Sequence, residues 1–225
     1  MRKFFVLLCC LGIASLACSS LPFETGDSGV QEILSAEPDS DALFEDDFSD
    51  DSKGWGVFED QDASLKIENG VFRILVTAPK YLIWSTPGED YSDAIIDVDT
   101  QKTAGPEAAE YGVICRYSED SSGNHSFYYL VIAGDTYAAI IKVIDDEQIE
   151  ISSRDVQFDS INGGNAANKI HAECIGSSLV LSANGTEIFS VTDTSLTGGD
   201  VGLIATTYEE SGVDVNFDNF VVKKP

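Results

Sequence analysis

Basic residues are scarce in this sequence. Its 225 residues include 13 Lys and Arg against 39 Asp and Glu, a formal net charge of −26 at pH 7. A surface this acidic repels the phosphates of nucleic acids and the head groups of anionic lipids. The composition therefore argues against nucleic acid as a partner. It suits a well-solvated surface, and it leaves open a divalent cation bound by clustered carboxylates.

Residues that support metal or nucleophilic chemistry are also few. The only histidines are His125 and His171, and neither a His-x-His nor a Cys-x-x-Cys spacing occurs. A zinc or other transition-metal site is therefore not expected. The sequence contains no G-x-S-x-G nucleophile motif and no glycine-rich phosphate loop. No motif in the chain predicts a catalytic reaction.

Helical periodicity is missing, and strand periodicity takes its place. Residues 111–143 contain three runs that alternate with a period of two, separated by turn-forming segments at 118–124 and 134–135. This pattern predicts an antiparallel meander with one face in a core. We expect that face to carry, strand by strand, Val113, Cys115 and Tyr117, then Phe127, Tyr129 and Val131, then Tyr137, Ala139, Ile141 and Val143.

Other strand and turn signals run through residues 42–225. Asn69-Gly70 and Asn184-Gly185 each separate two alternating runs, as in two-residue hairpins. In residues 213–222 the apolar positions change parity, which predicts a bulge near Asp218-Asn219. A dozen or more short strands without an amphipathic helix predict an all-β fold, a sandwich of two antiparallel sheets.

The first 17 residues have the pattern of an export signal. Arg2 and Lys3 precede an apolar stretch at residues 4–14, which is too short to span a bilayer. The small residue Ala17 then leads into Cys18, and this order resembles a bacterial lipoprotein signal. The resemblance implies that Cys18 becomes diacylated, and two acyl chains hold a protein on a membrane stably. The alternatives are an ordinary signal cut near Ala17 and an uncleaved anchor.

Residues 18–41 are expected to form a disordered tether. From residue 19 onward the segment holds six acidic residues and no Lys or Arg, and its apolar residues are scattered. Such a segment repels itself and cannot build a core, so it would act as a spacer between membrane and domain. A short helix at residues 30–34 is the competing interpretation. The folded domain is expected at residues 42–225.

Several segments of that domain resemble a known superfamily. They are FEDDFSDDSKGW (44–55), YGVICRY (111–117), NKIHAECIGSSLVLSANGTEI (168–188), GDVGLIA (199–205) and VDVNFDNFVV (213–222). Together they resemble the concanavalin A-like jelly rolls of the laminin-G-like and 3-keto-disaccharide-hydrolase-like families. The resemblance covers residues 42–222 and implies a jelly roll whose opening and closing strands lie side by side.

The resemblance says little about activity, because this fold hosts lectins, glycosidases and adhesive modules. Retaining glucanases of the fold carry an E-x-D-x-x-E run, and neither Asp97-Val98-Asp99 nor Glu147-Gln148-Ile149-Glu150 matches it. No catalytic residue is carried over. We interpret the chain as an envelope-anchored, non-catalytic lipoprotein that binds a glycan or another extracellular ligand. The alternatives are a glycosidase-like hydrolase and a structural or protein-interaction module.

One strand face suggests where a ligand could bind. The other parity of residues 111–143 is too apolar for a solvated face and also carries Arg116, Tyr128 and Lys142. Tyr128 could stack on a sugar ring while Arg116 and Lys142 hydrogen-bond its hydroxyls, and Trp84 is a further candidate. The alternative is that a loop covers this face as a secondary core.

Two more sites depend on which side chains meet. Cys115 and Cys174 are expected to point inward, and in an exported protein they could form a disulfide or remain two buried thiols. The opening and closing strands also carry several acids, which repel one another if they lie opposite. A structural calcium ion could neutralise them, whereas simple solvation is the alternative. The candidate ligands are Asp46, Asp47, Asp50, Asp214 and Asp218.

Overall fold

A computed structural model describes residues 41–152 and 155–225. The predicted export signal, Cys18 and nearly all of the predicted tether lie outside the described residues. Pro38–Pro225 forms one compact unit, and it contains every strand named below. Within the described residues there is no helix of the length and apolarity needed to cross a membrane.

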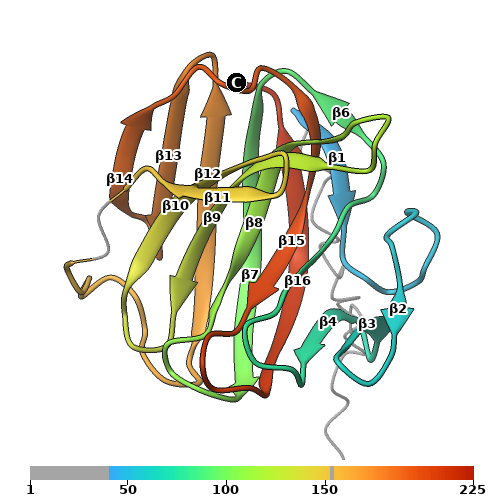
Figure 1. The fold of residues 1–225 in the computed structure, drawn as a ribbon, viewed down its shortest axis with the longest axis vertical. Helices are drawn as coiled ribbons and strands as arrows, with labels where there is room; N and C mark the ends of the chain where they lie inside the picture. The colour runs from blue at the N-terminus through green and yellow to red at the C-terminus, as the bar shows by residue number, and fades with distance from the viewer. Residues whose placement is uncertain (1–40, 153–154) are drawn as a thin grey trace, which may run out of the picture. The chain divides into compact units, whose positions relative to one another are not determined.

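The described residues form sixteen strands in two antiparallel sheets (Figure 1), as expected for a β-sandwich. The larger sheet has the order β14(Thr186–Thr192), β13(Ser178–Ala183), β12(Ala167–Ile175), β7(Ala94–Ala104), β16(Val213–Lys223), β4(Val71–Val76), β3(Ala63–Glu68) and β2(Phe58–Glu59), with β1(Ala42–Asp46) also paired to β16. The second sheet has the order β11(Glu147–Glu150), β10(Ala138–Ile144), β9(His125–Ala133), β8(Glu110–Glu119), β15(Gly199–Thr206) and β5(Leu82–Ser85), with β6(Asp90–Tyr91) also paired to β15.

The predicted turns and chain-end pairing are confirmed. Asn69-Gly70 and Asn184-Gly185 both have positive φ at each residue, as two-residue hairpin turns require. The opening strand β1 pairs with the closing strand β16 (Figure 1). The register of β16 against β7 shifts between Asp218 and Val221, where Asn219 has a left-handed φ of 51°. This shift is the predicted bulge.

The core between the sheets takes one row of side chains from each central strand. Val113 pairs with Leu130, and Cys115 pairs with Tyr128, so each pair shares a face. All four belong to the main core. The expected inward row of β9 and β10 is therefore wrong. Phe127, Tyr129 and Val131 instead lie on the opposite face of the sheet, where they form a second apolar cluster with Ala139, Ile141, Val143, Ile114 and Ile204.

A β-bulge in β8 explains why alternation fails there. After Cys115 pairs with Tyr128, the next pair is Ser118 with Ser126. Two residues of β8, Arg116 and Tyr117, thus oppose one residue of β9, and Arg116 has a φ of 58°. The extra residue moves the Tyr117 side chain to the face of the second cluster, instead of the inward face expected for it.

Candidate ligand-binding cleft

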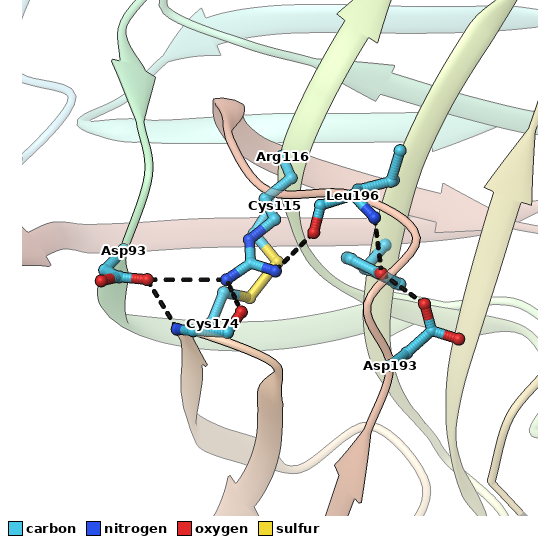
Figure 2. The surroundings of a disulfide bond; sticks show 8 residues. Asp93, Cys115, Arg116, Cys174, Asp193 and Leu196 are labelled. Carbon is cyan, nitrogen blue, oxygen red and sulfur yellow. Dashed lines mark hydrogen bonds and ion pairs between the residues drawn. A yellow bond between two sulfur atoms is a disulfide. The ribbon is translucent and has the colours of Figure 1, made fainter.

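A disulfide joins the two sheets beside this bulge. Cys115 in β8 and Cys174 in β12 are each 1% exposed and are bonded to one another, at a sequence separation of 59. The bond lies next to Arg116 (Figure 2). Of the two alternatives left open by the sequence, the structure therefore has the bonded pair.

Arg116 is a buried structural residue. Its side chain is 2% exposed, and its guanidinium donates hydrogen bonds of 2.7 Å to the carbonyl oxygens of Leu196 and Gly176 (Figure 2). Asp93 lies 3.6 Å from the same group. Arg116 thus fastens the turn after β12 and the loop before β15 to the bulge of β8. The expectation that it reaches a sugar hydroxyl is wrong.

Tyr128 and Lys142 belong to the same interior network. Tyr128 is fully buried; its hydroxyl donates to Asp193 at 2.6 Å and accepts a hydrogen bond from the backbone N–H of Leu196 at 3.0 Å. Lys142 donates to the other carboxylate oxygen of Asp193 at 2.6 Å. These contacts hold the pKa of Asp193 well below its usual range, although burial opposes them. The prediction of Tyr128 as a stacking surface is wrong, because the 193–196 loop covers it.

Trp84 is the remaining predicted ligand residue. It is partly exposed and packs at the edge of the second cluster. Its ring centroid lies 5.0 Å from that of His125 and 5.9 Å from that of Tyr117. The rings of Tyr117 and His125 are stacked, with their centroids 6.0 Å apart. We call these three side chains the aromatic platform.

A cleft of about 600 Å³ adjoins the platform and shares Tyr117 with it. Residues of β6, β8 and β15 line the cleft, together with the turns beside them. The side chains that matter for chemistry are those of Asp90, Tyr91, Tyr117, Glu119 and Asp200, and Gly198-Gly199 supplies backbone to the lining. Tyr91 and Tyr117 are half-buried, whereas Asp90 and Glu119 are exposed.

The backbone of the cleft is fixed by two close approaches. Gly199 has a φ of 143°, and a Cβ added there would overlap the carbonyl oxygen of Tyr117 and lie 2.7 Å from the carbonyl carbon of Arg116. Only glycine lets β15 begin this close to the bulge. Asp200 then accepts hydrogen bonds from the backbone N–H groups of Gly88 at 2.8 Å and Glu89 at 3.0 Å. These bonds hold the turn before β6 over the cleft.

The cleft has a negative electrostatic environment. Burial and the nearby charges of Glu89 and Asp200 raise the pKa of Tyr91 to about 12. Burial, aided by Glu119 and Asp200, also raises the pKa of Tyr117. Both phenols therefore remain neutral hydrogen-bond donors and acceptors near neutral pH.

Sequence reasoning missed Tyr91 and Tyr117 as site residues. Tyr117 was placed inward, since the bulge that turns it outward has Arg116 at its left-handed position, where Gly or Asn would have been a clearer signal. The detectable signal is Gly198-Gly199-Asp200 at the start of a strand, because paired glycines there indicate a close backbone approach.

The predicted calcium ligands do not come together. Asp46 lies at the end of β1 and pairs with Phe220, whereas Asp214 lies near the start of β16 and forms a two-pronged ion pair with Arg73. Asp47 and Asp50 each accept a backbone hydrogen bond two residues along the chain, and Asp218 accepts one from Asn219. In the part of the chain that is described, no group of His, Cys, Asp and Glu has the geometry of a metal site. The structure therefore does not gather these five aspartates into one site.

Comparison with solved structures identifies the type of fold. No protein-family profile matches the sequence, and no curated protein sequence matches it. Among solved structures, the chain is similar to the carbohydrate-binding module CBM66 from Bacillus subtilis, at 14% identity and a TM-score of 0.57, with 76% of this chain and 96% of that chain covered. The fold is a concanavalin A-like jelly roll.

Two further structures have the same jelly roll. A Bacillus subtilis protein of unknown function with a galectin-like fold has a TM-score of 0.62 at 11% identity, with 81% and 96% of the two chains covered. The Bacillus licheniformis β-glucanase has a TM-score of 0.58 at 10% identity, with 83% and 100% covered. At these identities the similarity establishes the jelly roll alone, because one fold carries many functions.

Proposed function

We propose that this jelly roll binds a glycan in the cleft between β6, β8 and β15, without catalysing its hydrolysis. The observation that carries the proposal is the continuity of the cleft with the aromatic platform through Tyr117. Sugar rings offer apolar C–H faces that pack on aromatic rings and hydroxyls that bond to carboxylates. A concave surface lined by aromatic rings and a few polar groups meets both needs.

The carboxylates of the cleft favour binding over hydrolysis. A glycosidase needs one carboxyl group in an apolar pocket as general acid and a second across the sugar ring. Asp90 and Glu119 are exposed to solvent. Asp200 is buried, but both its oxygens already accept backbone N–H groups, from Gly88, Glu89 and Val201. Solved neighbours that are named as a carbohydrate-binding module and as a β-glucanase support a carbohydrate ligand under either alternative.

The test is a glycan-array screen of the unit Pro38–Pro225, followed by calorimetry with the best ligands. Tyr117→Ala should weaken binding roughly tenfold, since it removes about 1.4 kcal/mol of ring contact. Phe58→Ala is the matched control, because Phe58 is 42% exposed on β2 in the other sheet. Release of reducing sugar from the bound glycan would support the hydrolase alternative. Absence of any glycan ligand would refute the proposal and favour a protein-interaction module.

We further propose that Cys18 anchors the chain to the outer face of a bacterial membrane. The support is the order of positive residues, apolar stretch, small residue and cysteine in residues 1–18. Cys18→Ser should release the protein from membranes or leave the precursor uncut. Normal processing and unchanged membrane partition of this variant would contradict lipidation.

A further inference from the structure

The charge of the cleft is one-sided. Its lining carries the carboxylates of Asp90, Glu119 and Asp200, and no Lys, Arg or His is among the described residues that line it. Three backbone N–H groups offset much of the charge of Asp200. The exposed carboxylates of Asp90 and Glu119 are therefore the ones that present negative charge to a ligand.

Two basic side chains next to the lining residues and the platform have partners outside the cleft. Arg116 lies beneath the bulge, where its guanidinium bonds to the carbonyl oxygens of Leu196 and Gly176 and faces Asp93. His125 is in contact with the carboxylate of Asp146 at 2.8 Å. Neither side chain offers an unshared positive charge to an anion in the cleft.

The same negative charge affects the two tyrosines of the cleft. Nearby carboxylates contribute to the raised pKa of Tyr91 and to that of Tyr117, and Asp200 acts on both. A ligand that stacks on these rings therefore lies within reach of uncompensated acids. With a net charge of −26 over the whole chain, the approach to the cleft is also unfavourable for anions.

Resting on the proposed glycan binding, we infer that the cleft selects amine-bearing glycans, accepts neutral ones more weakly and excludes uronate and sulfated ones. The ammonium group of a glucosamine-type unit would pair with Asp90 or Glu119 while its ring stacks on Tyr117 or Tyr91. Each exposed charge contact contributes roughly a two- to fivefold change in affinity, so two contacts predict a preference of roughly four- to twenty-five-fold.

A matched ligand pair tests the inference on the full-length chain. A chito-oligosaccharide with free, protonated amines is compared by calorimetry with its N-acetylated counterpart, which has the same backbone and no charge. An oligogalacturonate serves as the anionic probe. We expect the amine form to bind more tightly than the acetylated form, and the uronate not to bind. The preference should disappear at about 1 M salt, where the Debye length is about 3 Å.

Paired variants locate the effect in the cleft. The double variant Asp90→Asn/Glu119→Gln should bind both chito-oligosaccharides with equal affinity. Glu45→Gln/Glu187→Gln removes the same charge from exposed positions of β1 and β14 in the other sheet and should keep the preference. Equal affinities in the wild type, or tighter binding of the uronate, would overturn the inference while leaving glycan binding intact. If no glycan binds at all, the proposed function and the inference both fail.

Discussion

Asp46 accepts a 2.8 Å hydrogen bond from the indole N–H of Trp55, and both side chains are buried. The other carboxylate oxygen of Asp46 accepts the backbone N–H of Phe48 at 2.8 Å. Trp55 packs against Phe48, Phe72 and Phe220, so this carboxylate is part of an aromatic corner of the core. Its role is to satisfy two buried donors.

The first prediction concerns the two N–H groups, of Trp55 and Phe48, that donate to Asp46. Asp46→Ala leaves the Trp55 and Phe48 N–H groups without their acceptor and should lower the free energy of unfolding by about 2–4 kcal/mol. Asp46→Asn keeps one acceptor oxygen and removes a charge whose burial raises the pKa of Asp46, but its NH2 group faces the second N–H donor, so it should lose about 1–2 kcal/mol, less than Asp46→Ala. Urea unfolding compares them. Equal losses in both variants would contradict the hydrogen-bonding role.

Calcium should not stabilise the domain through the aspartates of the chain ends. Asp46 is engaged with Trp55, and Asp214 is engaged with Arg73 at 2.6 Å. If calcium bound only the native state and were present at 100 times its Kd, it would add about 2.7 kcal/mol to the free energy of unfolding. Thermal unfolding in chelator and then in excess calcium should give the same Tm, with magnesium as the control cation. A calcium-specific rise would reopen the site.

Much of the fold was predictable because its signals are local. Asn69-Gly70 and Asn184-Gly185 mark hairpins whatever their surroundings, since they suit positive φ. The change of parity after Phe217 marked the bulge of β16 in the same way. Each of these signals is contained in a few neighbouring residues.

The site was less predictable because it depends on register. Residues of both parities in β9 are buried, so apolar alternation could not say whether Tyr128 or Tyr129 faces the main core. The pairing of Cys115 with Tyr128 decides the question, and pairing is not visible in one sequence. The bulge at Arg116 then reverses Tyr117. The cleft was missed for these two reasons.

The disulfide should contribute strongly to stability. It closes a loop across 59 residues, for which loop-closure entropy predicts about 4 kcal/mol. The double variant Cys115→Ala/Cys174→Ala of Pro38–Pro225 should show this loss in urea unfolding. Thiol labelling of the denatured, unreduced wild-type unit should find no free thiol. Two labelled thiols would contradict the bond.

The close approach at the cleft predicts a difference between two glycines. Gly199→Ala forces a Cβ against the Tyr117 carbonyl group in a backbone region that other residues rarely adopt. It should destabilise the domain by about 2–4 kcal/mol and weaken glycan binding. Gly185→Ala is the control, because its φ is also positive, at 82°, but no atom lies within 4 Å of the added Cβ. Gly185→Ala should lower the free energy of unfolding by only about 1 kcal/mol. Comparable losses at both positions would contradict the steric role of Gly199.

His171 should make stability depend on pH above its unfolded pKa of about 6.5. In the larger sheet its ring contacts Asp97 at 2.9 Å and Glu173 at 3.2 Å, and Lys223 lies 3.7 Å from Asp97. The hydrogen bond with Asp97 is the main cause of a raised pKa for His171, and burial opposes it. A raised folded pKa means that the folded state binds the proton more tightly than the unfolded state. The stabilisation is therefore complete below the unfolded pKa of about 6.5 and is lost as pH rises through the folded pKa.

Because His171 is about a third exposed, solvent screening limits the loss to about 1 kcal/mol. Urea unfolding as a function of pH should show this decline in the wild type and in His125→Gln, which removes the other histidine. His171→Gln should not show it. Asp97 works in the opposite direction at low pH, since its lowered pKa adds stability that is lost as pH falls below about 3.8. If the wild type and His171→Gln have the same slope above pH 6.5, the ion pair with Asp97 contributes nothing to folding.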